Sequence, residues 1–180
     1  MELISFPVST LAYILALIVV LSAAGVDLAT RRIPNGFTIT IGLLGLGFAI
    51  GVGGLPGLIV ALAGFAVTFG LLLPGYLLGF TGGGDLKLMA GLGCILGPKL
   101  SLHAMLLYYL ISAFLALLFA VYATYFLGCS GPFARYRAMA CTLFTSGRFV
   151  YIRPSVRESM GARLPMAPAI ALATIMAPLL

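Results

Sequence analysis

The sequence predicts an all-α, polytopic membrane protein in which six transmembrane helices form one bundle. Of its 180 residues, 62% are hydrophobic and only 8% are charged, a composition too apolar for a soluble domain with a single core. The apolar residues occur in long runs that end at charged residues or at Gly and Pro clusters. Lys and Arg gather between some of these runs and are nearly absent between others. We therefore expect a single membrane-embedded domain over residues 1–180.

Five apolar runs are long enough to cross a bilayer, which takes about 20 helical residues. No Lys or Arg precedes the first run, so we expect a retained helix there and not a cleaved signal peptide. A sixth run, about residues 86–96, would rise only about 17 Å as a helix. It must therefore include its flanking residues or be shielded by neighbouring helices. The five long runs cover approximately residues 4–26, 36–52, 55–78, 102–127 and 165–180.

The distribution of Lys and Arg sets the expected orientation. If the N-terminus lies outside, nine of the ten cationic residues fall on the inner side and only Lys99 falls on the outer side. Cytoplasmic loops of membrane proteins carry an excess of Lys and Arg, so the bundle is predicted to be N-out and C-out. The nine inner residues are Arg31, Arg32, Lys87, Arg135, Arg137, Arg148, Arg153, Arg157 and Arg163.

Six of these arginines lie in one long polar segment, residues 128–164, which we expect to be a basic cytoplasmic loop between the fifth and sixth helices. From Pro132 onward, its apolar residues recur near helical spacing, which is compatible with a basic helix in the inner headgroup layer. An irregular loop held near anionic lipid is the alternative. We attribute the net charge of +6 to Lys and Arg residues that set the topology and contact anionic headgroups, and we expect no nucleic-acid partner.

Carboxylates are scarce in this chain, and two of the four lie where a long apolar run meets a break. Asp27 precedes a charged break and Asp85 follows a glycine-rich one, whereas Glu2 and Glu158 lie at the chain start and in the basic loop. A carboxylate at the centre of a membrane helix costs roughly 2.5 to 3.5 kcal/mol on insertion scales. The predicted topology brings Asp27 and Asp85 to the same depth on the cytoplasmic side.

Two carboxylates at one depth are suited to amide hydrolysis. Because two nearby negative charges repel, such a pair shares one proton. One carboxylate then deprotonates a water as it attacks a peptide carbonyl, and the other protonates the carbonyl oxygen. This chemistry needs no metal and no cofactor. Gly82, Gly83 and Gly84 supply a backbone without Cβ groups, able to adopt unusual conformations and to let an extended substrate approach Asp85.

Each candidate residue also has a structural interpretation. Asp27 taken alone is typical of an interfacial residue or a helix cap, and Asp85 alone of an N-cap after a glycine turn. Lys87 is placed to contact substrate or to act on Asp85, with a topology anchor as the alternative. The aromatic residues of the 102–127 run, Tyr108 among them, are expected to face lipid or to pack at the membrane interface.

Two segments around the aspartates carry a family resemblance. The run Asp27-Leu-Ala-Thr-Arg-Arg-Ile-Pro-Asn35 and the run Gly82-Gly-Gly-Asp-Leu-Lys-Leu-Met-Ala90 resemble the two catalytic motifs of bacterial type IV prepilin peptidases, which are GxGD membrane aspartic peptidases. The resemblance implies that Asp27 and Asp85 are the catalytic residues. It also implies an inner-membrane enzyme that removes the short basic leader from prepilins or pseudopilins on the cytoplasmic side, for type IV pilus assembly or protein secretion.

One departure from the family pattern concerns a second activity. Larger members carry a cytoplasmic domain with paired CxxC motifs and also methylate the new N-terminus of the pilin. This chain has three cysteines and no CxxC, so we expect a peptidase without N-methyltransferase activity, similar to the short enzymes that serve tight-adherence (Flp) pili. Two other classes compete with this interpretation: a small proton-coupled membrane transporter, and a non-catalytic assembly subunit of a pilus or secretion machine.

Overall fold

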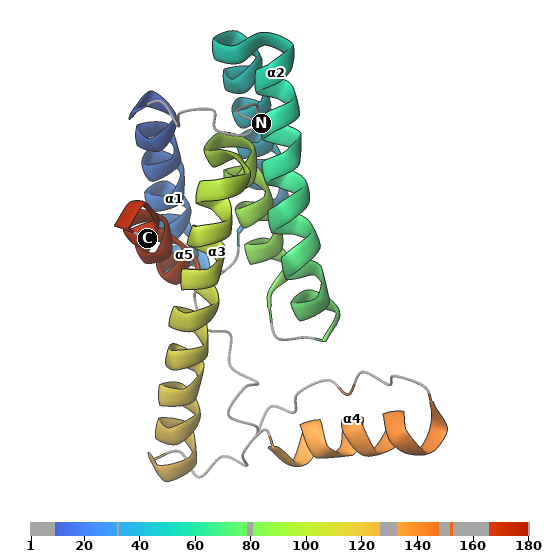
Figure 1. The fold of residues 1–180 in the computed structure, drawn as a ribbon. Helices are drawn as coiled ribbons and strands as arrows, with labels where there is room; N and C mark the ends of the chain where they lie inside the picture. The colour runs from blue at the N-terminus through green and yellow to red at the C-terminus, as the bar shows by residue number, and fades with distance from the viewer. Residues whose placement is uncertain are drawn as a thin grey trace. The chain divides into compact units, whose positions relative to one another are not determined.

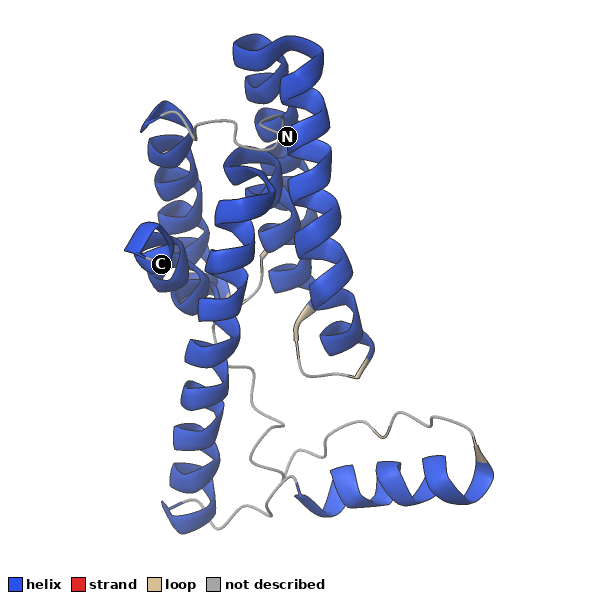
Figure 2. Cartoon of the chain, viewed as in Figure 1, coloured by secondary structure: helices blue, strands red, loops and turns tan. Residues whose placement is uncertain are grey.

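The computed structural model describes residues 10–31, 33–78, 81–126, 133–147, 152 and 166–179. Figure 2 shows that these residues form helices joined by short loops and turns. By the packing of its backbone the chain divides into two units, Met1–Ile111 with Pro165–Leu180, and Ser112–Leu164. The elements, labelled in Figure 1, are α1 (Thr10–Thr30), α2 (Asn35–Leu77), α3 (Gly83–Phe126), α4 (Phe133–Ser146), α5 (Ala167–Met176) and the 3-10 turn η2 (Ala177–Leu179).

Three helices, α1, α2 and α3, are long and apolar enough to cross a membrane. The chain is therefore a helical membrane protein, as the composition predicts. Large side chains such as Leu11, Ile18 and Leu110 are exposed, as lipid-facing positions require. The number of spans, the N-out and C-out orientation and the single-domain organisation stay predictions.

Helix α1 continues further than expected, to Thr30 instead of about residue 26, while residues 1–9 lie outside the described part of the chain. It ends at Arg31, whose φ is 52°. The N–H of Arg31 donates to the carbonyl of Asp27 at 2.7 Å, which is the hydrogen bond of a left-handed helix end. Asp27 therefore lies inside the last turn of α1.

Helix α2 is interrupted at Gly54, where φ is 58° and ψ is −141°. This backbone conformation is open to glycine and strained for other residues. The chain reverses there, as Figure 1 shows at the turn of the teal ribbon. After the reversal, Gly57 lies directly against the backbone carbonyl of Ala49. The break falls between the runs predicted at 36–52 and 55–78.

Helix α3 is interrupted in the same way at Gly97, with φ 72° and ψ 176°, followed by Pro98. Its first segment contains the short run predicted at 86–96. The helix begins at Gly83, and residues 88–96 are all buried. The run therefore both includes its flank and is shielded by neighbours. The second segment starts earlier than the predicted residue 102.

Two glycines let α2 and α3 approach closely. A Cβ on Gly64 would collide with the carbonyl of Gly93, and a Cβ on Gly93 would lie 2.5 Å from the hydroxyl oxygen of Thr68. Membrane helices pack through such small residues because there is little hydrophobic force between them in lipid. This contact fixes the first segment of α3, which carries Asp85.

The last helix, α5, is shorter than the span predicted at 165–180. It has 10 residues and is followed by the three-residue η2, so α5 rises only about 15 Å. Pro168 lies in its first turn, where a proline is tolerated because the N–H it lacks has no helical acceptor. Helix α5 packs against α1 through alanines such as Ala16 and Ala173, both 0% exposed.

The second unit, described by itself, contains the end of α3 and helix α4. Helix α4 confirms a helix within the predicted basic loop, so an irregular conformation is wrong for residues 133–146. Arg137 is exposed on it, and Phe144 is 88% exposed. The predictions for Arg148, Arg153, Arg157 and Arg163, as for Arg32 in the first unit, fall on residues outside the described ones.

Candidate active site

Asp27 is buried, with 6% of its surface exposed. Its Oδ2 accepts the backbone N–H of Ala167, the first residue of α5, at 3.0 Å. The first N–H groups of a helix have no acceptor within that helix, and the positive end of the helix dipole favours a carboxylate there. The interpretation of Asp27 as a helix cap is therefore partly right. Asp27 caps α5, which is distant in the sequence, and not α1, the helix in which it lies.

Asp85 is also buried, with 8% of its surface exposed. It lies in the first turn of α3, which begins at Gly83, so it is not the N-cap residue. Oδ2 of Asp85 lies so close to Gly82 that a Cβ there would be 3.1 Å from it, and the carboxyl group interacts electrostatically with Tyr108.

The two carboxylates lie in the same packed unit, and the negative charge of Asp27 acts on Asp85. Asp27 comes from α1 and Asp85 from α3, so the fold brings together the two acids that the sequence singled out. Asp27 is held by a backbone N–H of α5. Such an arrangement can share a proton between two acids and hold a water for attack on a carbonyl.

The glycines before Asp85 act through their lack of a side chain and not through unusual dihedral angles. None of Gly82, Gly83 and Gly84 has a positive φ. A Cβ on Gly82 would lie only 3.1 Å from Oδ2 of Asp85, and a Cβ on Gly84 would lie 3.4 Å from Ile33. The unusual conformation expected of these glycines is therefore absent, and the approach of a substrate to Asp85 stays a prediction.

Lys87 lies on the exposed side of α3, next to the start of α2. Its Nζ donates a hydrogen bond of 2.8 Å to Oδ1 of Asn35. The bond ties the segment that follows Asp27 to the helix that carries Asp85. Lys87 therefore links the two motifs directly, a role that neither of the two sequence-based interpretations included.

Tyr108 is the residue that sequence reasoning assigned wrongly. It is not lipid-facing: it is 1% exposed, and it interacts electrostatically with Asp85. Other aromatic residues of the same helix, such as Phe114 and Tyr125, are 60% and 82% exposed as expected. The only sequence signal is position, because Asp85 and Tyr108 lie at nearly equal distances along the chain from the break at Gly97.

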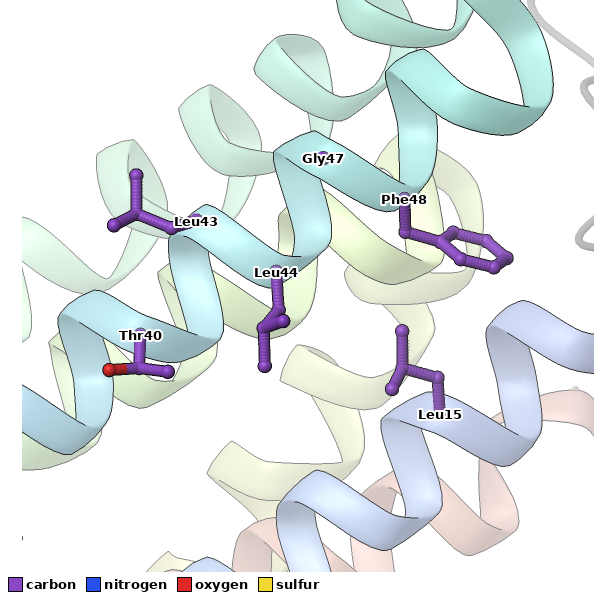
Figure 3. A pocket seen from close by; sticks show the side chains of 6 residues that line it. All are labelled: Leu15, Thr40, Leu43, Leu44, Gly47 and Phe48. Atoms are coloured by element: carbon purple, nitrogen blue, oxygen red, sulfur yellow. The ribbon is translucent and has the colours of Figure 1, made fainter.

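An apolar groove runs along α1 and α2, away from the predicted site residues. Figure 3 shows Leu15 of α1 opposite side chains of α2. Neither aspartate and none of the glycines 82–84 lines it. The lining residues are Leu15, Thr40, Leu43, Leu44, Gly47 and Phe48.

The fold and the site define a helical membrane protein with a buried pair of interacting aspartates. A profile of the type IV leader peptidase family matches residues 14–132. This match covers more than half of the chain and includes both aspartates, so the chain belongs to the type IV leader peptidase family and is a peptidase. Comparisons with curated proteins and with solved structures gave no match.

Proposed function

We propose that this protein is an aspartic endopeptidase that removes the basic leader peptide from prepilins or pseudopilins at the cytoplasmic face of the bacterial inner membrane. Asp27 and Asp85 form its catalytic pair. The observation that carries the proposal is the burial of both carboxylates in one unit, where the charge of one acts on the other. Two such acids are costly in an apolar chain, and ionisable groups in membrane segments are typically functional.

In the proposed reaction a water bound between the two carboxyl groups attacks the scissile peptide carbonyl. One aspartate takes the proton of the water, and the other donates a proton to the carbonyl oxygen. The aspartate that took the proton of the water then gives it to the amide nitrogen as the C–N bond breaks, and the other aspartate regains a proton from a hydroxyl of the collapsing diol. The products are the free leader and the mature N-terminus. There is no covalent intermediate with the enzyme.

Access of the substrate is proposed to occur beside the start of α3. Gly82 is exposed and a side chain there would crowd Asp85, so the backbone at this point leaves room for an extended peptide. A helical peptide keeps its carbonyls in hydrogen bonds, so the substrate must unwind near the glycines before cleavage. Lys87, exposed and tied to Asn35, lies on the same element and is proposed to contact the substrate.

The proposed topology has six transmembrane helices with both termini outside. The breaks at Gly54 and Gly97 support it because each interrupts a helix of more than 40 residues, whereas one pass needs about 20 residues. Helix α4, with the exposed Arg137, is proposed to contact anionic headgroups on the cytoplasmic side. Alkaline phosphatase fused after Gly54 should be active, and the same enzyme fused after Ser146 should be inactive. The reverse pattern would contradict the topology.

The absence of N-methyltransferase activity is the second part of the proposal. It rests on the sequence, which contains no CxxC motif. Mass spectrometry of the pilin matured by this enzyme should show a free N-terminal amine. A methylated N-terminus formed by the purified enzyme with S-adenosylmethionine would contradict this part alone.

The peptidase proposal is tested by co-expressing a prepilin with the wild-type enzyme or with Asp27→Asn or Asp85→Asn. Both variants should reach the membrane at wild-type levels and leave the prepilin uncleaved. Glu158→Gln, which removes a carboxylate of the basic loop, is the matched control and should cleave normally. Cleavage by both Asn variants would overturn the proposal and favour a non-catalytic subunit. A proton flux in reconstituted vesicles that either variant abolishes would favour a transporter.

A further inference from the structure

We propose that Asn35 is a positioning residue of the active site. By accepting a hydrogen bond from Lys87, it holds the connection between α1 and α2 against the first turn of α3. This contact sets the position of Asp27 relative to Asp85. The inference rests on the proposed aspartic peptidase function and extends it to a residue that touches neither aspartate.

The connection between α1 and α2 begins directly at the turn that carries Asp27. The N–H of Arg31 donates to the carbonyl of Asp27 at 2.7 Å, and the positive φ of Arg31, 52°, ends the helix there. Helix α2 begins at Asn35. A movement of this short connection therefore moves the helical turn that holds the carboxylate.

Two contacts join this connection to the start of α3. The side chain of Ile33 lies so close to Gly84 that a Cβ there would be 3.4 Å from the Cβ of Ile33. Two residues further on, Oδ1 of Asn35 accepts the hydrogen bond from Nζ of Lys87 at 2.8 Å. Gly84 and Lys87 are three residues apart, so they are neighbours on one face of the helix. Asp85 directly follows Gly84 and lies in the same turn.

The side chain of Asn35 does not serve its own helix. Asparagine is typical of the N-cap position, but here the N-cap of α2 is Pro34, and no side chain caps this helix. The contact that the amide oxygen makes is with Lys87, 52 positions further along the chain. The hydrogen bond therefore joins two helices instead of stabilising the start of one.

The proposed pair of aspartates needs such a restraint. The charge of Asp27 acts on Asp85, and two like charges repel, which favours separation of the end of α1 from the start of α3. The hydrogen bond opposes this separation from outside the pair. Because Asn35 and Lys87 are both exposed, their contact adds little to the stability of the fold.

The test compares Asn35→Leu with Asn35→Asp in the full-length enzyme. Leucine has a similar size and no acceptor, whereas aspartate keeps an acceptor at the same place. Thr40→Val is the matched control: it also removes one exposed hydrogen bond of α2, but that bond, 2.9 Å long, goes to the carbonyl of Gly36 in the same helix. The proteins are reconstituted in vesicles with a prepilin that carries a basic leader and an apolar helix. Leader removal is measured at the optimum pH of each variant, and SDS unfolding is followed by circular dichroism.

Asn35→Leu should lower kcat by about tenfold, the expected effect of losing one hydrogen bond from a charged donor. Its KM should stay within about twofold of the wild type, and its unfolding should be unchanged. Asn35→Asp should recover kcat to within about threefold of the wild type, and Thr40→Val should match the wild type. Wild-type kinetics of Asn35→Leu would overturn the proposal. A raised KM at unchanged kcat would also overturn it, because Asn35 would then bind substrate.

A double-mutant cycle tests whether Asn35 acts through Lys87. If it does, the variant with both Asn35→Leu and Lys87→Met should be no slower than Lys87→Met alone, because the contact is already lost. Losses in kcat that multiply would show that the two residues act independently and would overturn the proposal.

The inactive Asp85→Asn variant separates this inference from the function on which it rests. If Asp85→Asn is inactive and Asn35→Leu behaves as the wild type, only the positioning role fails. If Asp85→Asn cleaves the prepilin, the aspartic peptidase function itself fails.

Discussion

Replacing Asp27 by Ala and by Asn separates the structural role of this carboxylate from its proposed chemical role. Its Oδ2 accepts the N–H of Ala167 at 3.0 Å in a buried environment. Alanine removes the acceptor and leaves a buried helix-terminal N–H without a partner. Loss of such an acceptor costs about 1–3 kcal/mol, and loss of a helix cap about 0.5–2 kcal/mol. We expect Asp27→Ala to lower the free energy of unfolding by about 2 kcal/mol.

Asparagine should behave differently because its amide oxygen still accepts the N–H of Ala167. Asn and Asp are nearly equivalent as helix caps. The lost charge weakens the interaction with the dipole of α5 by about 0.3–1 kcal/mol, and the lost repulsion with Asp85 offsets part of this. We expect the stability of Asp27→Asn to lie within about 1 kcal/mol of the wild type, while both variants fail to cleave prepilin.

The assay is unfolding in mixed micelles with increasing SDS, followed by circular dichroism, together with leader cleavage by the same preparations. If Asp27→Ala is as stable as the wild type, the hydrogen bond to α5 does not carry the structural role assigned to it. If Asp27→Asn is as unstable as Asp27→Ala, unfolding alone explains the loss of cleavage, and the claim that Asp27 acts in the chemistry loses this support.

Three further substitutions test other parts of the structure. Gly82→Ala places a Cβ 3.1 Å from Oδ2 of Asp85; it should displace this oxygen and lower kcat at least tenfold, with stability changed by less than about 1 kcal/mol. Gly54→Ala should destabilise the fold by about 1–3 kcal/mol because of its positive φ, measured by SDS unfolding. Gly51→Ala, at a helical position with open space, is the matched control and should be neutral or stabilising by up to about 1 kcal/mol. Lys87→Met removes the hydrogen bond to α2 and should lower the free energy of unfolding by about 1 kcal/mol or less. If the loss in kcat, converted to an activation free energy, exceeds this loss of stability, the hydrogen bond positions the active site.

Much of the arrangement follows from local features of the sequence. The breaks at Gly54 and Gly97 were predictable because glycine and proline interrupt apolar runs that are otherwise helical throughout. The aspartate pair was predictable because carboxylates are rare in an apolar chain and both stand at a boundary. Burial of Asp27 and Asp85 in one unit agrees with that reasoning.

The contacts that hold the pair were not predictable in the same way. The donor to Asp27 is the backbone N–H of Ala167. Many residue types could supply this N–H, so the sequence gives no sign of the contact. Tyr108 is buried, whereas Tyr122 and Tyr125 are exposed, and only the register between the two segments of α3 distinguishes it from the other tyrosines of its helix. Such contacts depend on how the helices pack against one another, as in the close contact between Gly64 of α2 and Gly93 of α3.

The central claim is that Asp27 and Asp85 act as one catalytic unit, and the kinetics of their single and double variants test it most directly. Cleavage rates of a reconstituted prepilin are measured for the wild type, Asp27→Asn, Asp85→Asn and the double variant. Residues that act together are strongly non-additive, so each single variant should lose at least about a thousandfold in kcat and the double variant should be no slower than either. A single variant within tenfold of the wild type, or a double variant in which the two losses multiply, would contradict the claim.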